Sequence, residues 1–188
     1  LEEREVTVSR VEASVTYPAN FQLVAAMNPC PCGHFPDRSR CRCTDGQITR
    51  YLQKVSGPML DRIDICVEAS PVTYGDIKSS GNNESSREIR ARVEQARKIQ
   101  GERFAGENIR CNGEMSGRHI RKFCWLGREE EKFMEEIFEK LALSARMHDR
   151  ILKVARTTAD LAEEEKIRLA DLCEAVSYVK SRDKFWGN

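Results

Sequence analysis

The sequence predicts an α/β fold that passes into an all-helical C-terminal part. Residues 21–27 (FQLVAAM) form a continuous apolar stretch, which is typical of a central strand in a parallel sheet covered on both faces. Residues 63–69 are a second candidate for a buried strand. From about residue 115 onward, apolar residues recur at helical spacing instead. We therefore expect the last strands of a doubly wound parallel sheet, followed by a helical domain.

Composition limits the classes of function. The chain has 188 residues, of which 40% are hydrophobic, and its 31 basic residues nearly balance its 30 acidic ones. No strong overall field attracts nucleic acid or anionic lipid, so any contact with DNA must be local. No apolar run approaches the roughly 20 residues of a membrane helix, and the first residues do not resemble a signal peptide. We expect a cytoplasmic protein without membrane contact, and a sequence that begins inside a larger fold.

The elements before residue 70 can be read in order. Apolar residues alternate between positions 6 and 15, which predicts one or two strands with a turn between them. The strand at 21–27 ends at Asn28, because the proline that follows lacks the donor that a central strand needs. Thr44 or Asp45 then caps a helix to about residue 55. A short helical turn at 59–62 precedes the second candidate strand.

The rest of the chain is predicted to be mainly helical. Residues 74–86 are rich in Gly, Ser and Asn and indicate an exposed loop. Ser85 or Ser86 begins a long charged helix that reaches about residue 104. Four more helices are expected at about 116–125, 128–141, 144–162 and 169–179. The third of these has the widest apolar stripe and should be largely buried.

Four of the eight cysteines lie within fourteen positions, in two Cys-X-Cys pairs: Cys30, Cys32, Cys41 and Cys43. Four thiolates on one short loop match the tetrahedral coordination of Zn²⁺, and they leave no open position for water or substrate. Side chains at i and i+2 of an extended strand are too far apart for one ion. The backbone must therefore bend at Pro31 and at Arg42.

Other interpretations of this loop stay open. It can be a reduced loop without metal, or it can form a disulfide only on oxidation. His34 can replace one cysteine as a ligand, although a single loop histidine is more often solvated.

Three motifs occur in an order that carries a resemblance: AAMNPCPCG around Asn28, SGPMLDRIDI around residues 57–64, and Ser144-Ala145-Arg146 at a predicted helix start. Together they resemble the magnesium chelatase-like branch of AAA+ (P-loop NTPase) proteins, and specifically the ComM/YifB family, over essentially the whole chain. The resemblance implies that residues 1–113 are the C-terminal part of an AAA+ core with a Cys-rich loop and a linking helix. Residues 114–188 then form the helical lid.

The resemblance also implies roles for single residues. Asn28 matches sensor 1, the polar side chain that orients the water attacking the γ-phosphate. Arg62 matches the arginine finger, which reaches the nucleotide of a neighbouring subunit. Arg146 matches sensor 2 at the start of a lid helix, and Arg150, one turn later, is the competing candidate.

Each of these residues also has a plainer interpretation. Asn28 can belong to an ordinary Asx-Pro turn, and Arg62 can form a salt bridge with Asp61 or Asp64. The two lid arginines can lie on a solvated helix face.

The phosphate-binding motif of the family does not occur in these residues. The sequence contains no Gly-X4-Gly-Lys-Ser/Thr loop and no apolar strand ending in Asp-Glu. We expect this chain alone neither to bind ATP tightly nor to hydrolyse it. The resemblance implies that the intact protein uses ATP and Mg²⁺, forms a homohexamer and acts on DNA, in recombination or natural transformation.

Three other functions are consistent with parts of the sequence. A magnesium chelatase subunit would drive metal insertion into a porphyrin, but the Cys-X-Cys pairs favour the ComM/YifB type. A zinc-stabilised binding module, in which the helical bundle docks a partner, would need no ATPase. A helical scaffold would have all of its arginines solvated.

Overall fold

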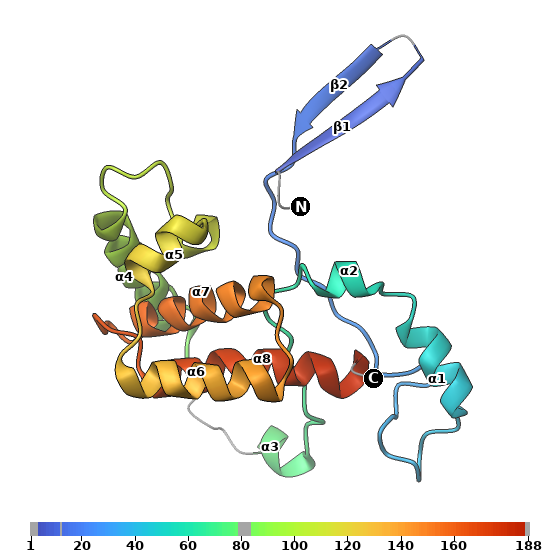
Figure 1. The fold of residues 1–188 in the computed structure, drawn as a ribbon. Coiled ribbons are helices and arrows are strands. Elements are labelled where there is room, and N and C mark those ends of the chain that lie inside the picture. Colours follow the sequence, from blue (N-terminus) through green and yellow to red (C-terminus); the bar gives the residue numbers. More distant parts are fainter. Residues whose placement is uncertain (1–3, 12, 79–83, 187–188) are drawn as a thin grey trace. The chain divides into compact units, whose positions relative to one another are not determined.

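The computed structural model describes residues 4–11, 13–78 and 84–186 (Figure 1). The chain forms two compact units. The first contains Leu1–Ile63 together with the C-terminal residues Asp183–Asn188, and the second contains Asp64–Arg182. Each unit has a hydrophobic core of its own.

The first unit begins with a β-hairpin. Strand β1 (Glu5–Arg10) pairs antiparallel with β2 (Ala13–Pro18), which confirms the two strands predicted from the alternation. Thr7 lies opposite Thr16, and their Oγ1 atoms are 3.0 Å apart. The other face carries the larger apolar side chains, Val6, Val8, Val15 and Tyr17, all of them exposed.

The predicted parallel sheet does not form within the described residues, where the hairpin is the only sheet. Residues 21–27 have no strand partner, and Val24 is 83% exposed. Residues 63–69 are also without strand structure, and Val67 is 74% exposed. A central strand exists only through hydrogen bonds to strands on both sides. Apolar sequence alone cannot supply those neighbours.

Three short helices follow the hairpin. Helix α1 (Asp45–Leu52) is capped by Thr44, whose Oγ1 accepts from the N–H of Gln47, while the Gln47 side chain accepts from the N–H of Thr44. Helix α2 (Gly57–Leu60) has proline in its first turn, where the missing donor costs nothing. Helix α3 (Tyr74–Lys78) corrects the prediction of a continuous loop at this position.

The longer helices belong to the second unit, and their predicted starts are confirmed. They are α4 (Ser86–Arg103), α5 (Gly117–Phe123), α6 (Arg128–Lys140), α7 (Ala145–Leu161) and α8 (Leu169–Trp186). A short 3₁₀ helix that was not predicted, η1 (Asn112–Glu114), lies between α4 and α5. Ser85, Ser116 and Ser144 are the N-caps of α4, α5 and α7. Helix α8 runs seven residues beyond the predicted end at 179, and its last turn belongs to the first unit. None of the described helices combines the length and the apolar character of a membrane span.

Helix α7 is the centre of the second unit. Its residues Ile151 and Ala155 are almost completely buried, as the wide apolar stripe predicted. Helices α4 and α5 both contact α7, so α4 lies in the same unit as the helices that follow it. The predicted domain division at residue 113 would separate α4 from these partners.

A charged network is buried between α4, η1 and α7. Asp160 is fully buried and accepts from Arg103 Nη1 and from Asn112 Nδ2, each at 2.7 Å. Arg156, one turn earlier on α7, donates from Nε to the same carboxylate at 3.1 Å. The second guanidinium also donates to the carbonyl of Glu165 at 2.7 Å. Buried charges are tolerated only when paired in this way.

Candidate metal centre and nucleotide-contact residues

The cysteine loop turns back on itself directly after Cys30. The N–H of Gly33 donates to the carbonyl of Cys30 at 3.0 Å, and Gly33 has a φ of +80°, in the left-handed region that favours glycine. This turn contains the predicted bend at Pro31. It brings Cys30 and Cys32 together, although side chains two apart on an extended strand would diverge.

The four sulfur atoms converge. All four Sγ atoms lie within 4.8 Å of one another. The distances are 3.4 Å from Cys30 to Cys32, 3.8 Å from Cys30 to Cys41, and 3.6 Å from Cys32 to Cys41. A tetrahedral site with Zn–S bonds near 2.3 Å requires sulfur separations of about 3.8 Å. The donor set therefore fits Zn²⁺, and His34 is not one of the converging ligands.

The local environment shifts the pKa values of the cluster thiols in opposite directions. The backbone N–H groups of His34 and Arg42 lower the pKa of Cys32 to about 6. The N–H of Cys32 favours the thiolate of Cys43, but burial and the neighbouring sulfurs outweigh it and raise the pKa of Cys43 to about 11. Adjacent thiolates repel one another, so the four groups cannot all ionise easily without a cation between them.

Arg38 holds the loop against α1. Its guanidinium forms an ion pair with Asp45, donates from Nη1 to the carbonyl of Cys43 at 3.3 Å, and lies 5.0 Å from the centre of the Phe35 ring. Sequence analysis did not single out this residue. The one signal in the sequence is that Arg38 lies seven residues before Asp45, the acidic residue at the start of a predicted helix.

A small hydrophobic core lies against the cysteine cluster. Cys30, Ile48 and Leu52 are buried together. Trp186 packs against them and donates from Nε1 to the carbonyl of Leu52 at 3.1 Å. This side chain was also missed, and a tryptophan in an otherwise charged C-terminal stretch was its only signal.

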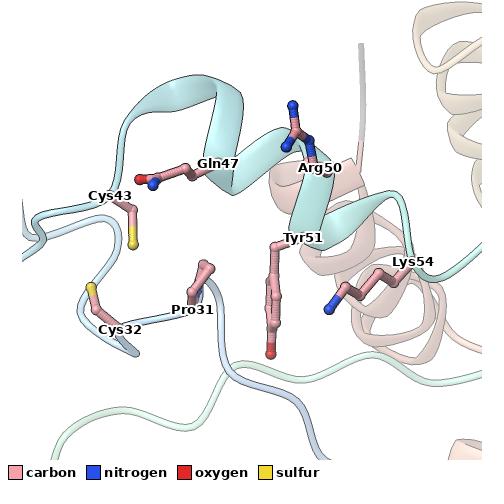
Figure 2. A pocket seen from close by; sticks show the side chains of 7 residues that line it. All are labelled: Pro31, Cys32, Cys43, Gln47, Arg50, Tyr51 and Lys54. Carbon is pink, nitrogen blue, oxygen red and sulfur yellow. The ribbon is translucent and has the colours of Figure 1, made fainter.

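Beside the cluster, the loop and α1 line an open hollow of about 380 Å³ (Figure 2). Cys32 and Cys43 lie at one end of it, with their sulfur atoms directed toward each other. Arg50, Tyr51 and Lys54 lie along the helix side.

Asn28 lies next to the cysteine loop and not at the end of a strand. Its side chain is adjacent to Gly33, where an added Cβ would lie 3.8 Å from the Asn28 Cγ atom. The residue is exposed. Its assignment as sensor 1 therefore stays a prediction.

Arg62 follows helix α2 and is exposed. It donates from Nη1 to the carbonyl of Pro58 at 2.8 Å. Within the described part of the chain it forms no ion pair, although Asp61 and Asp64 are close in sequence. Asp64 instead pairs with Arg150, Nε to Oδ1 2.8 Å. The predicted alternative of a salt bridge to Arg62 is therefore absent.

The two lid arginines differ in environment. Arg146 is exposed in the first turn of α7, whereas Arg150 is only 9% exposed and is engaged with Asp64. Both belong to the second unit, while Asn28 and Arg62 belong to the first.

Comparison with known families covers nearly the whole chain. Residues 1–77 match the family described as "Magnesium chelatase, subunit ChlI", and residues 83–179 match "Magnesium chelatase, subunit ChlI C-terminal". These domains imply an AAA+-like fold.

Individual relatives agree with these matches. The chain is 41% identical over 179 residues to the competence protein ComM of Haemophilus influenzae and 42% identical over the same length to the uncharacterised protein YifB of Escherichia coli. An uncharacterised protein of Mycobacterium tuberculosis is 35% identical over 178 residues. Each alignment covers 95% of this chain but only 34% to 35% of the relative, so the chain spans about a third of their length. The chain therefore belongs to the magnesium chelatase family, as a ComM/YifB-like member.

Proposed function

We propose that this chain is part of an ATP-dependent, hexameric motor of the ComM/YifB type that acts on DNA. In this proposal Asn28, Arg62 and Arg146 contribute to nucleotide binding, and the phosphate-binding loop and the acidic metal-binding strand belong to parts of the intact protein outside these 188 residues. ATP and Mg²⁺ are the cofactors of the intact protein. The name of one relative, competence protein ComM, supports a role in natural transformation or recombination.

The observation that carries the proposal is the state of Arg62. An exposed arginine flanked by aspartates would normally pair with one of them, yet its guanidinium is held by a backbone carbonyl alone in the described residues. Most of its donors are not used by the hydrogen bond to Pro58. A guanidinium of this kind can bind phosphate oxygens with two parallel hydrogen bonds and offset the charge that develops on a transferred phosphoryl group.

Burial supports Arg146 over Arg150 as the sensor 2 residue. Arg150 is largely buried and already forms an ion pair with Asp64, and moving it to a nucleotide would break that pair and remove its side chain from the buried position. Arg146 is exposed in the first helical turn, so its side chain is accessible to a ligand from solvent.

The cysteine cluster has a structural role in this proposal. Cys30, Cys32, Cys41 and Cys43 would hold one Zn²⁺, which supplies stabilisation of the loop and no catalysis, because four sulfur ligands leave no open coordination position. The sulfur separations support this assignment.

A mixing experiment on the intact protein tests the motor. Arg62→Ala should lower the ATPase rate by about a thousandfold, and a variant with a disabled phosphate-binding loop should also be inactive. Mixing the two should restore part of the activity, because an intact pocket on one subunit then meets Arg62 of its neighbour. Arg90→Ala, a change of an exposed arginine on α4, is the matched control and should have no effect. Failure of the mixture to recover activity would show that Arg62 does not act between subunits.

A further inference from the structure

The hollow beside the cysteine cluster combines two cations with an aromatic ring. Tyr51, in the last turn of α1, and Lys54, two residues after the helix, line it, and Lys54 Nζ lies 5.5 Å from the centre of the Tyr51 ring. Arg50 extends outward from the helix at the rim (Figure 2). The tyrosine is partly exposed, so its ring is accessible from the hollow.

The positive charges of this hollow are not compensated by acidic side chains. Across the described ranges, neither Arg50 nor Lys54 forms an ion pair. Asp45, the aspartate nearest to Arg50 in sequence, forms an ion pair with Arg38. A divalent ion held by four thiolates carries a formal charge of about −2. The same loop carries two exposed arginines, Arg40 and Arg42.

These features match the chemistry of single-stranded nucleic acid. Such sites combine cations that follow the phosphates with aromatic rings on which bases stack. A hollow of about 380 Å³ is at the small end of ligand pockets and suits one nucleotide better than a folded partner. Only an unstacked base can stack on a ring that lines such a hollow, which disfavours duplex DNA.

We propose that Arg50, Tyr51 and Lys54 form a contact site for single-stranded DNA, with a base stacked on Tyr51 and two successive phosphates on Lys54 and Arg50. This inference rests on the proposed action on DNA and identifies the part of the surface involved. It also accounts for DNA binding by a chain whose net charge is only +1, because the charge is concentrated locally.

Binding of fluorescent oligothymidylate to the zinc-loaded intact protein, measured by anisotropy over a range of salt concentrations, tests the site. The double variant Arg50→Gln/Lys54→Gln should weaken binding about tenfold and reduce the slope of log K against log salt by about 1.4, since two phosphate contacts are lost. Tyr51→Ala should weaken binding about tenfold but leave the slope unchanged, and Tyr51→Phe should bind normally. Arg90→Gln/Lys98→Gln, with the same charge change on exposed positions of α4, is the control.

The outcomes separate this site from the proposed motor. Zinc content measured for each variant shows that the loop is intact. If the wild-type protein binds DNA and the Arg50/Lys54 variant behaves like the α4 control, the site is wrong and the motor stands. Equal losses for duplex and single strands would overturn the stacking assignment. If the wild-type protein neither binds DNA nor shows DNA-stimulated ATPase, both proposals fail.

Discussion

Arg150 forms an ion pair with Asp64, with 2.8 Å between Nε and Oδ1. The arginine side chain is 10% exposed, and the aspartate is 69% exposed. The pair therefore joins the segment after α2 to helix α7 within the second unit, and solvent weakens it from one side.

We expect a modest coupling between these two residues. A double-mutant cycle with Asp64→Ala and Arg150→Met should give an interaction free energy of about 1 kcal/mol, measured by chemical unfolding. Because the aspartate is exposed, added salt should reduce the coupling. Strictly additive effects would show that the ion pair contributes nothing to stability.

The roles of the two lid arginines can be separated by stability and activity. Arg146→Ala should leave the unfolding midpoint unchanged and lower the ATPase rate of the intact protein. Arg150→Ala should lower the midpoint, because it removes a buried side chain and leaves Asp64 without this partner. Calorimetry and steady-state ATPase measure the two effects. The reverse pattern would identify Arg150 as the nucleotide contact.

Asp160 should be the most sensitive polar position in the second unit. Asp160→Asn removes the negative charge that faces Arg103 and Arg156, which are 13% and 3% exposed at their side chains. Leaving these cations uncompensated should cost about 3 to 5 kcal/mol of unfolding free energy. The control Asp149→Asn is the same change at a partly exposed position of α7 and should stay within about 0.5 kcal/mol. A loss below about 1 kcal/mol at Asp160 would contradict the network.

Metal analysis tests the cysteine cluster. The purified chain should contain one Zn²⁺, and Cys30→Ser or Cys41→Ser should lose it, while Cys173→Ser on the exposed face of α8 should retain it. Substitution with Co²⁺ should give the visible spectrum of a tetrahedral tetrathiolate. If the wild-type chain contains no metal after refolding with excess zinc, the loop is a reduced turn that does not bind metal.

Trp186 should report on the metal. It packs against the core of Cys30 and Leu52, so removal of zinc by a chelator should expose the indole and shift its emission to longer wavelength. The second tryptophan, Trp125, is 52% exposed and belongs to the other unit, and Trp125→Phe removes its signal. Unchanged emission after complete metal removal would show that this contact does not depend on the cluster.

Local chemistry explains which parts of the fold were predictable. Thr44, Ser85 and Ser144 cap the helices that follow them, because a hydroxyl one position before a helix satisfies donors that nothing else reaches. The apolar stripe of α7 predicted its burial for a similar reason, since helical spacing places those residues on one face. The end of α8 was not predictable, because contacts from residues far away in sequence decide whether a last turn persists.

Some features of the candidate site were also predictable from the sequence, and others were not. Sequence by itself determined that four cysteines could meet, and it placed Asn28, Arg62 and Arg146 in the motifs that mark the family. Only the tertiary structure decided that Asp64 pairs with Arg150 and not with Arg62, and that Arg38 and Trp186 support the metal loop. The parallel strands at 21–27 and 63–69 show the same limit. Periodicity and caps depend on neighbours along the chain, whereas strand pairing and the choice of ionic partner depend on which groups folding brings together.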